Sequence, residues 1–265
     1  MRALTTGVWF AATIVGLMAC GESRPPEDRS PSADSGAARE VAQEATETSY
    51  RVIEVVDGGS VRGMVRYGGA VPPGRTVAVS EDTATCGTSR EVNPVRVDSR
   101  GGLADAVVAL VDIRQGKALV VSSPPTLDQR GCSFTPHILL APTGTTVRVL
   151  NGDPITHNVH TAAFDNRSVN RTQPKGLEVV ELRFDEPETV KVKCDLHPWM
   201  TAWIVATDHP YQAVTDESGE FVLSDIPPGT YRLQVWHEIL GSQEQVVTIT
   251  AGGTTDLNIE FTAGG

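Results

Sequence analysis

The chain lacks an excess of basic residues. It has 22 lysines and arginines against 33 aspartates and glutamates, which gives a formal net charge of −11 at pH 7. A nucleic-acid partner requires a basic surface, so the composition argues against one. Hydrophobic residues make up 40% and charged residues 21% of the 265 positions, the ordinary balance of globular domains. The length suits two domains better than one.

Long apolar runs are also scarce. The first, residues 8–18, is shorter than the ~20 residues that a bilayer-spanning helix needs. It follows a short basic start and leads into Leu-Met-Ala-Cys at residues 17–20, which is the layout of a secretory signal. This ending resembles the lipobox of bacterial lipoproteins. The resemblance implies a signal peptide over residues 1–20, acylation of Cys20, and attachment to the periplasmic side of a bacterial membrane, the outer membrane in particular. An ordinary signal peptide with an incidental cysteine is the alternative.

Apolar residues become rare between residues 21 and 50, where proline, serine and alternating charges prevail. Such a segment cannot bury enough apolar surface to fold. We therefore expect a disordered N-terminal tether that joins the lipid anchor at Cys20 to the folded part.

No long amphipathic helix is evident after about Val52. Short stretches rich in β-branched residues recur instead, and glycine or proline turns separate them. Examples are residues 61–67, 107–111, 146–150, 179–184, 190–194, 203–206, 220–223, 231–236 and 246–250. This pattern predicts an all-β protein built from sandwiches.

Cysteines number only four, and we expect them to have three different roles. Export places them in an oxidising compartment. If Cys20 is acylated, three remain, and Cys194 lies among residue types that bind metals. Cys86 and Cys132 are then left to form a disulfide. The alternative is that one of these two is a second metal ligand, since His137 follows Cys132 by five residues.

Metal-binding side chains gather in two segments that each follow a predicted strand. The first contains His157 and His160, and the second contains Cys194, His197 and Met200 at steps of three residues. Two imidazoles and a thiolate with a weak axial thioether form the ligand set of blue copper sites. Zinc more typically takes further cysteines or carboxylates and no thioether. The pattern therefore predicts one copper ion.

These two segments, HNVH at 157–160 and CDLHPWM at 194–200, resemble those of cupredoxins of the amicyanin type. The resemblance extends over residues 117–207 and implies a Greek-key β-sandwich. It implies a type 1 copper site with His157, Cys194 and His197 as strong ligands and Met200 as the axial ligand. Asn158 would brace the loop that carries Cys194, and the family pattern gives His160 no ligand role.

Sequence on both sides of the copper segment resembles a second family, the carboxypeptidase regulatory-like (transthyretin-like) β-sandwich. Residues 215–219 (TDESG) and 227–231 (PPGTY) match its turns, and residues 58–65 match its opening strand. We therefore expect residues 52–115 and 208–262 to form one sandwich interrupted by the cupredoxin. In the alternative, serial arrangement, residues 52–115 contribute strands to the cupredoxin itself. The whole arrangement resembles exported proteins called methylamine-utilisation-like.

The second domain shows no catalytic set, because it lacks a zinc-binding His-x-x-Glu motif. His237 and Glu238 are expected to be an exposed pair at the end of a strand.

We therefore predict electron transfer rather than an enzymatic activity, with a redox protein docking near His197 and Trp199. Copper handling is an alternative, although a chain with only four methionines has no methionine-rich tail. A surface interaction module without a metal is the other alternative.

Overall fold

The computed structural model describes residues 49–176 and 179–262, and in these it is all-β with one short helix. The all-β prediction is confirmed. The predicted signal peptide, Cys20 and nearly all of the predicted tether lie outside the described residues. Within the described ranges, no helix has the length and apolar character needed to cross a membrane.

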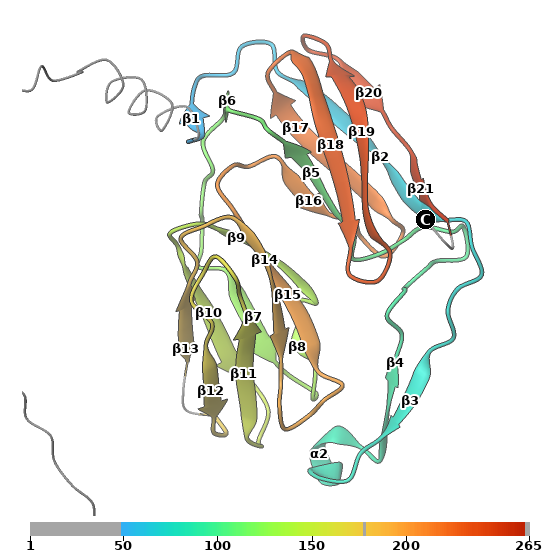
Figure 1. The fold of residues 1–265 in the computed structure, drawn as a ribbon, viewed down its shortest axis with the longest axis vertical. Helices are drawn as coiled ribbons and strands as arrows, with labels where there is room; N and C mark the ends of the chain where they lie inside the picture. The colour runs from blue at the N-terminus through green and yellow to red at the C-terminus, as the bar shows by residue number, and fades with distance from the viewer. Residues whose placement is uncertain (1–48, 177–178, 263–265) are drawn as a thin grey trace, which may run out of the picture. The chain divides into compact units, whose positions relative to one another are not determined.

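One sandwich, here called the flanking sandwich, takes its strands from the beginning and the end of the described chain (Figure 1). Its first sheet has the order β16 (Gln212–Val214), β5 (Val107–Val111), β18 (Gly229–His237) and β19 (Gly241–Ile249). Its second sheet has β17 (Glu220–Ile226), β2 (Gly59–Tyr67) and β20 (Thr254–Asp256), and β21 (Ile259–Phe261) also pairs with β2. A short parallel pair, β1 (Arg51–Val52) with β6 (Gln115–Gly116), accompanies them.

The alternation of side chains explains why these strands form a sandwich. In β2 the side chains of Val61 and Val65 are buried and those of Arg62 and Arg66 are exposed. Successive residues of a strand face opposite sides, so the valines meet the core. The turn into β17 requires Gly219, whose φ is +78° and whose Cβ, if present, would lie 2.4 Å from a backbone oxygen.

The second sandwich, here called the central sandwich, holds the strands between residues 126 and 207. Its four-stranded sheet has the order β13 (Val180–Arg183), β10 (Thr146–Asn151), β7 (Thr126–Gln129) and β8 (Phe134–Thr135). Its five-stranded sheet has β12 (Asn170–Gln173), β11 (His157–Ala162), β14 (Glu188–Lys193), β15 (Thr201–Thr207) and β9 (Ile138–Pro142). The core between the sheets includes Val149, Val192 and Ile204, together with Cys194 and Met200.

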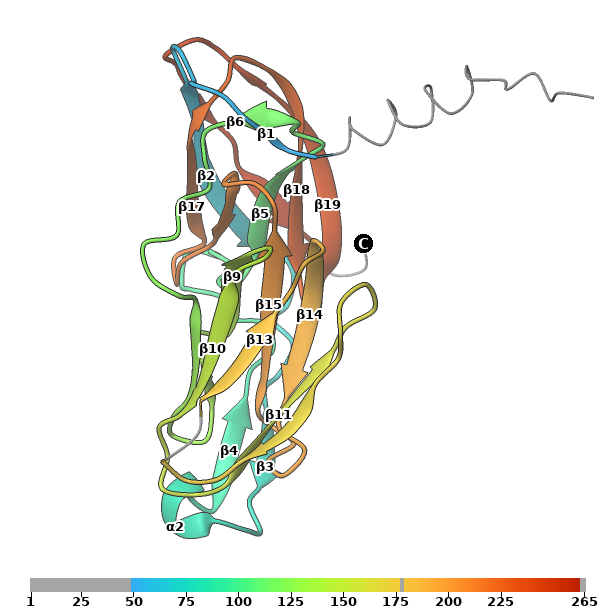
Figure 2. The same cartoon turned by 90° about the vertical axis from the view of Figure 1, so that its left-hand side faces the viewer.

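A third part, here called the arm, is the hairpin of residues 75–92. Strands β3 (Arg75–Ala78) and β4 (Ser89–Val92) pair with each other, and helix α2 (Thr83–Cys86) lies between them. The arm runs alongside the central sandwich with α2 at its tip (Figure 2), and Val79 and Cys86 pack into the core of that sandwich. The sequence pattern assigns all of residues 52–115 to the flanking sandwich, whereas these two residues of the arm pack into the central one.

A disulfide explains where the arm packs. Cys86 at the end of α2 is bonded to Cys132 in the loop between β7 and β8, with an S–S distance of 2.04 Å. The predicted disulfide is confirmed, and neither of these cysteines is available as a metal ligand.

The two sandwiches contact each other through a small apolar cluster and a polar network. The rings of Trp203 and Trp236 lie edge to face with 5.0 Å between their centroids. Glu238 accepts hydrogen bonds from His137 Nε2 at 2.5 Å and from Trp203 Nε1 at 2.9 Å. His237 is buried and Glu238 is 13% exposed. The expectation of an exposed strand-end pair was therefore wrong. His237 lies on the same face of β18 as the buried Leu233 and Val235, and Glu238 hydrogen-bonds to the central sandwich.

The His137–Glu238 pair makes stability depend on pH. Burial lowers the pKa of His137, but the hydrogen bond and charge of Glu238 outweigh it and leave this pKa above its usual value. Burial raises the pKa of Glu238, but hydrogen bonds from His137 and Trp203 leave it below its usual value. The stabilisation that His137 contributes is therefore lost as the pH rises through the pKa that His137 has in the folded protein. The stabilisation that Glu238 contributes is lost as the pH falls through the pKa that Glu238 has in the folded protein.

We therefore expect Glu238→Gln to lower the free energy of unfolding most between about pH 4.5 and 6.5, the window between the ordinary pKa values of the two groups. The difference from wild type should shrink on both sides of this window. Urea denaturation at a series of pH values measures it, with Glu54→Gln at an exposed position as the control. A difference that does not vary with pH would contradict the ion-pair account.

Candidate metal centre

The topology brings the two segments that are predicted to bind a metal to one end of the five-stranded sheet. His157 is the first residue of β11, and Cys194 directly follows β14. These strands are antiparallel neighbours in which His160 pairs with Lys193, so the start of one lies beside the end of the other. His197 and Met200 lie on the loop that joins Cys194 to β15. Within this loop the Met200 N–H donates to the His197 carbonyl at 2.9 Å.

Three side chains converge there. The Nδ1 atoms of His157 and His197 are 3.0 Å apart, and Cys194 Sγ lies 3.7 Å from His197 Nδ1. The ligand atoms of all three residues lie within 4.8 Å of one another. His157 is 0% exposed, and Cys194, His197 and Met200 are each 1% exposed.

These separations fit a bound metal ion. First-row ions bind imidazole nitrogen at about 2.0–2.1 Å and thiolate sulfur at about 2.3 Å, so donors that share one ion lie about 3 to 4 Å apart. Burial raises the pKa of the Cys194 thiol, and metal binding must therefore displace its proton. Burial lowers the pKa of His157, which keeps that imidazole neutral and free to bind a metal. The axial role of Met200 stays a prediction.

Asp153 holds the ring of His157 in place, although it was not among the predicted site residues. His157 Nε2 donates to Asp153 Oδ2 at 2.9 Å, which leaves Nδ1 facing the other ligands. The carboxylate also accepts the N–H groups of Gly131 at 2.7 Å and Cys132 at 2.8 Å. Burial raises the pKa of Asp153, but these hydrogen bonds outweigh it and leave the pKa low. A carboxylate four residues before a candidate ligand was the available signal.

Cys132 connects the arm to His157 and to the loop that carries His197. Its sulfur bonds to Cys86, and its N–H donates to Asp153, which orients His157. Its carbonyl accepts Trp199 Nε1 at 3.0 Å, which fixes the loop beside His197. The disulfide therefore belongs to the framework that supports the site.

Asn158 lies where a brace for the Cys194 loop is expected. Its Oδ1 accepts the N–H of Asp195 at 3.1 Å, and its Nδ2 donates to Asn170 Oδ1 at 2.6 Å. The side chain thus joins β11 to the residue after Cys194. His160 instead contacts the Asp195 carboxylate at 2.8 Å, on the outer side of β11.

We expect Asn158→Ala to loosen this loop and weaken copper binding about 10- to 100-fold, the usual effect of losing a partner of a metal ligand. Competition with a chelator of known affinity measures the change. Asn166→Ala is the matched control, because it removes amide hydrogen bonds from another loop of the same sandwich. Equal affinity in the two variants would contradict the bracing role.

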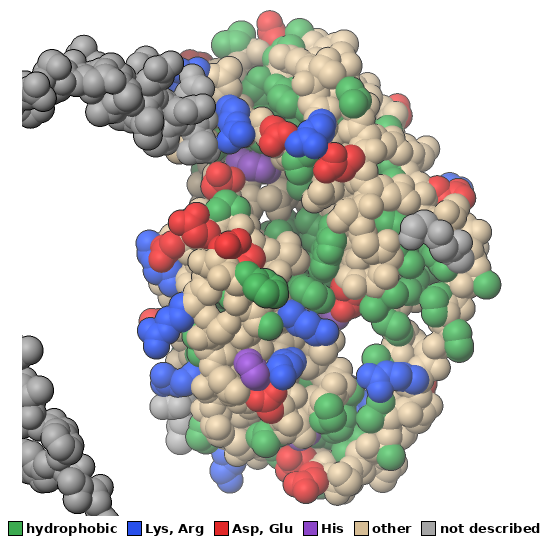
Figure 3. All heavy atoms as spheres, in the orientation of Figure 1, with side chains coloured by type: hydrophobic (Ala, Val, Ile, Leu, Met, Phe, Trp, Pro, Cys, Tyr) green, Lys and Arg blue, Asp and Glu red, His purple; other side chains and the backbone are tan. Residues whose placement is uncertain are grey.

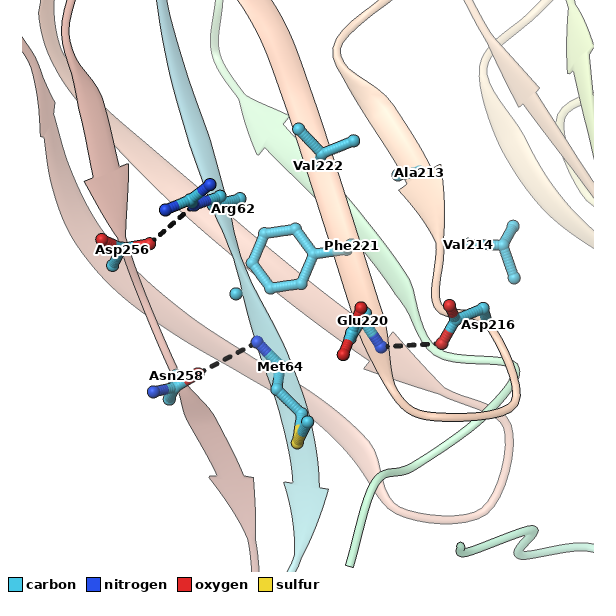
Figure 4. A pocket seen from close by; sticks show the side chains of 11 residues that line it. Arg62, Met64, Ala213, Val214, Asp216, Glu220, Phe221, Val222, Asp256 and Asn258 are labelled. Atoms are coloured by element: carbon cyan, nitrogen blue, oxygen red, sulfur yellow. Dashed lines mark hydrogen bonds and ion pairs between the residues drawn. The ribbon is translucent and has the colours of Figure 1, made fainter. Parts of the chain in front are cut away.

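The cavity shown in Figure 4 lies in the flanking sandwich and has a different chemistry. Its volume is about 670 Å³, and neither histidine nor cysteine is among its lining residues. Its polar groups pair with each other, as in Arg62 with Asp256 and the Met64 N–H with Asn258. The donor set that fits a metal lies in the central sandwich.

Comparison with known proteins gives one family match and several similar structures. Residues 189–262 match the carboxypeptidase regulatory-like domain. That range covers β16 to β21 but begins within β14 of the central sandwich, earlier than the expected residue 208. No curated protein matches the chain.

Three similar solved structures are a copper-containing nitrite reductase, an amicyanin variant and a purple cupredoxin. A copper-containing nitrite reductase from Thermus scotoductus is 23% identical over 38% of this chain and 27% of its own, with a TM-score of 0.31. An oxidised variant of amicyanin is 24% identical over 34% of this chain and 88% of its own, with a TM-score of 0.30. A purple cupredoxin from Nitrosopumilus maritimus is 22% identical over 31% of this chain and 98% of its own, with a TM-score of 0.27.

Proposed function

We propose that this protein is an exported, membrane-anchored blue copper protein that transfers one electron at a time. The observation that supports this most is the buried convergence of His157 Nδ1, His197 Nδ1 and Cys194 Sγ. A soft thiolate favours Cu(I), and imidazole accepts both oxidation states. When bound, copper supplies the one-electron couple. No catalytic step is part of this proposal.

The protein's own side chains prepare the site for this task. Asp153 fixes the orientation of His157, and Asn158 holds the loop that carries Cys194. The four candidate ligands are shielded from water, which strengthens electrostatic interactions at the metal. A site held this rigidly changes little between oxidation states, and this favours electron transfer.

A partner must reach the site from outside, and we propose that a redox protein docks near His197 and Trp199. Leu196 is 53% exposed and Pro198 is exposed on the same loop, so this part of the surface offers apolar contacts. The face drawn in Figure 3 shows acidic, basic and apolar side chains interspersed, with no continuous basic patch. Attachment through Cys20 to the periplasmic side of a bacterial membrane completes the proposal and rests on the sequence pattern alone.

Titration of the apo protein with copper tests the function. We expect one ion per chain and an intense visible thiolate-to-copper charge-transfer band, whereas zinc should give a colourless protein. Copper binding without the band would favour copper handling. A chain that binds no copper would leave the interaction-module hypothesis.

A further inference from the structure

The tip of the arm lies against the outer edge of His197. Asp82 Oδ2 is 3.2 Å from His197 Nε2, although the two residues are 115 positions apart in the sequence. The imidazole is 1% exposed, whereas the Asp82 side chain is 39% exposed. One edge of the ring therefore faces the metal-binding group, and the other edge faces this carboxylate.

The side chain of Asp82 does not cap its own helix. Asp82 is the N-cap of α2, a position where aspartate usually accepts backbone N–H groups of its own helix. Its side chain makes no such bond, and its φ of 53° and ψ of 28° are left-handed, which non-glycine residues adopt uncommonly. The N–H groups of Thr85 and Cys86 bond to the Asp82 carbonyl instead. The carboxylate of Asp82 is therefore available to hydrogen-bond to His197.

Three residues of the arm hold it in this position. The Cys86–Cys132 disulfide joins its tip to the central sandwich. Arg90 donates to the Gly131 carbonyl and to Ser133 Oγ, each at 2.9 Å. Val79 is buried in the same core as Cys194. The contact between Asp82 and His197 therefore belongs to a fixed framework.

We propose that the arm caps the copper site and that Asp82 is a positioning residue for His197. This inference rests on the proposed function. The carboxylate accepts the Nε2 proton of His197, so Nδ1 keeps its lone pair toward the metal. Its negative charge favours the more positive oxidation state of the ion and lowers the reduction potential. The cap also covers the outer edge of His197, so a docking partner contacts the arm together with Leu196 and Trp199.

Two variants separate the charge of Asp82 from its hydrogen bond. Asp82→Asn keeps an acceptor oxygen but removes the charge, and Asp82→Ala removes both. Glu81→Gln is the matched control, because it removes a charge from the exposed neighbouring residue.

In the apo protein, nitrogen-15 NMR of the histidine rings should show a slowly exchanging Nε2 proton on His197. We expect this signal in wild type and Asp82→Asn, and its loss in Asp82→Ala. A His197 ring proton that exchanges freely with water in the wild type would overturn the cap, and this readout needs neither copper nor a variant that folds.

In the copper-loaded protein, Asp82→Asn should raise the affinity of the site for Cu(I) relative to Cu(II) about tenfold. For a one-electron couple this corresponds to a rise in the reduction potential of about 59 mV. Glu81→Gln should leave the potential near that of wild type. A normal charge-transfer band with equal potentials in the two variants would overturn the role of Asp82 and leave the proposed function standing. A wild type without the band would instead overturn the proposed function, and the NMR result would still decide whether the cap exists.

Discussion

Replacing Cys194 by serine is expected to abolish the intense visible absorption of the copper-loaded protein. The band requires a thiolate bound to copper, and a serine hydroxyl is a hard donor that stays protonated at neutral pH. Cys194 is the only free cysteine among the described residues, so no other thiol there can replace it. Absorption and electron paramagnetic resonance spectra of the copper-loaded variant measure the loss.

Cys20→Ser is the matched control for that experiment. It makes the same chemical change at the predicted lipidation site, so we expect it to keep the absorption band and to lose membrane attachment. Persistence of the band in Cys194→Ser would contradict the assignment of Cys194 as the thiolate ligand.

Removal of the disulfide, by Cys86→Ser with Cys132→Ser, is expected to destabilise the protein strongly. The bond closes a loop of 46 residues, and the chain-entropy model gives about 4 kcal/mol for a loop of this length. Both positions are buried, so the two hydroxyls add an unfavourable burial of polar groups. Urea denaturation of the apo protein measures the change in the free energy of unfolding.

The same double variant should loosen the metal centre. The arm would lose its covalent attachment, and with it the cap on His197. The backbone of Cys132 hydrogen-bonds to Asp153 and to Trp199. Without the disulfide, this backbone would be held less rigidly. Wild-type protein treated with a reductant should behave like the variant. A loss of stability below about 1 kcal/mol would show that the arm is held by its other contacts.

The sequence predicted the parts of the site that depend on local spacing. His197 follows Cys194 by three residues on one short loop, and His157 begins a strand, so strand pairing alone brings them together. The alternation of buried valines in β2 likewise predicts a sandwich. Such features are properties of short segments, and each segment carries its own signal.

Features that depend on distant packing were not predictable. Asp82 lies in an exposed turn far from His197 in the sequence, and no pattern marks it as a partner of a metal ligand. Glu238 follows the end of a regular strand, and its partners His137 and Trp203 belong to the other sandwich. Asp153 is the intermediate case, because its position four residues before His157 is a weak local signal.

The most direct test of the central claim is a redox titration of the copper-loaded wild-type protein, followed by its visible absorption through repeated cycles. We predict a reversible one-electron couple in which the band disappears on reduction and returns fully on oxidation, with one copper ion retained per chain throughout. Release of copper on reduction, or failure of the band to return, would contradict electron transfer by this protein.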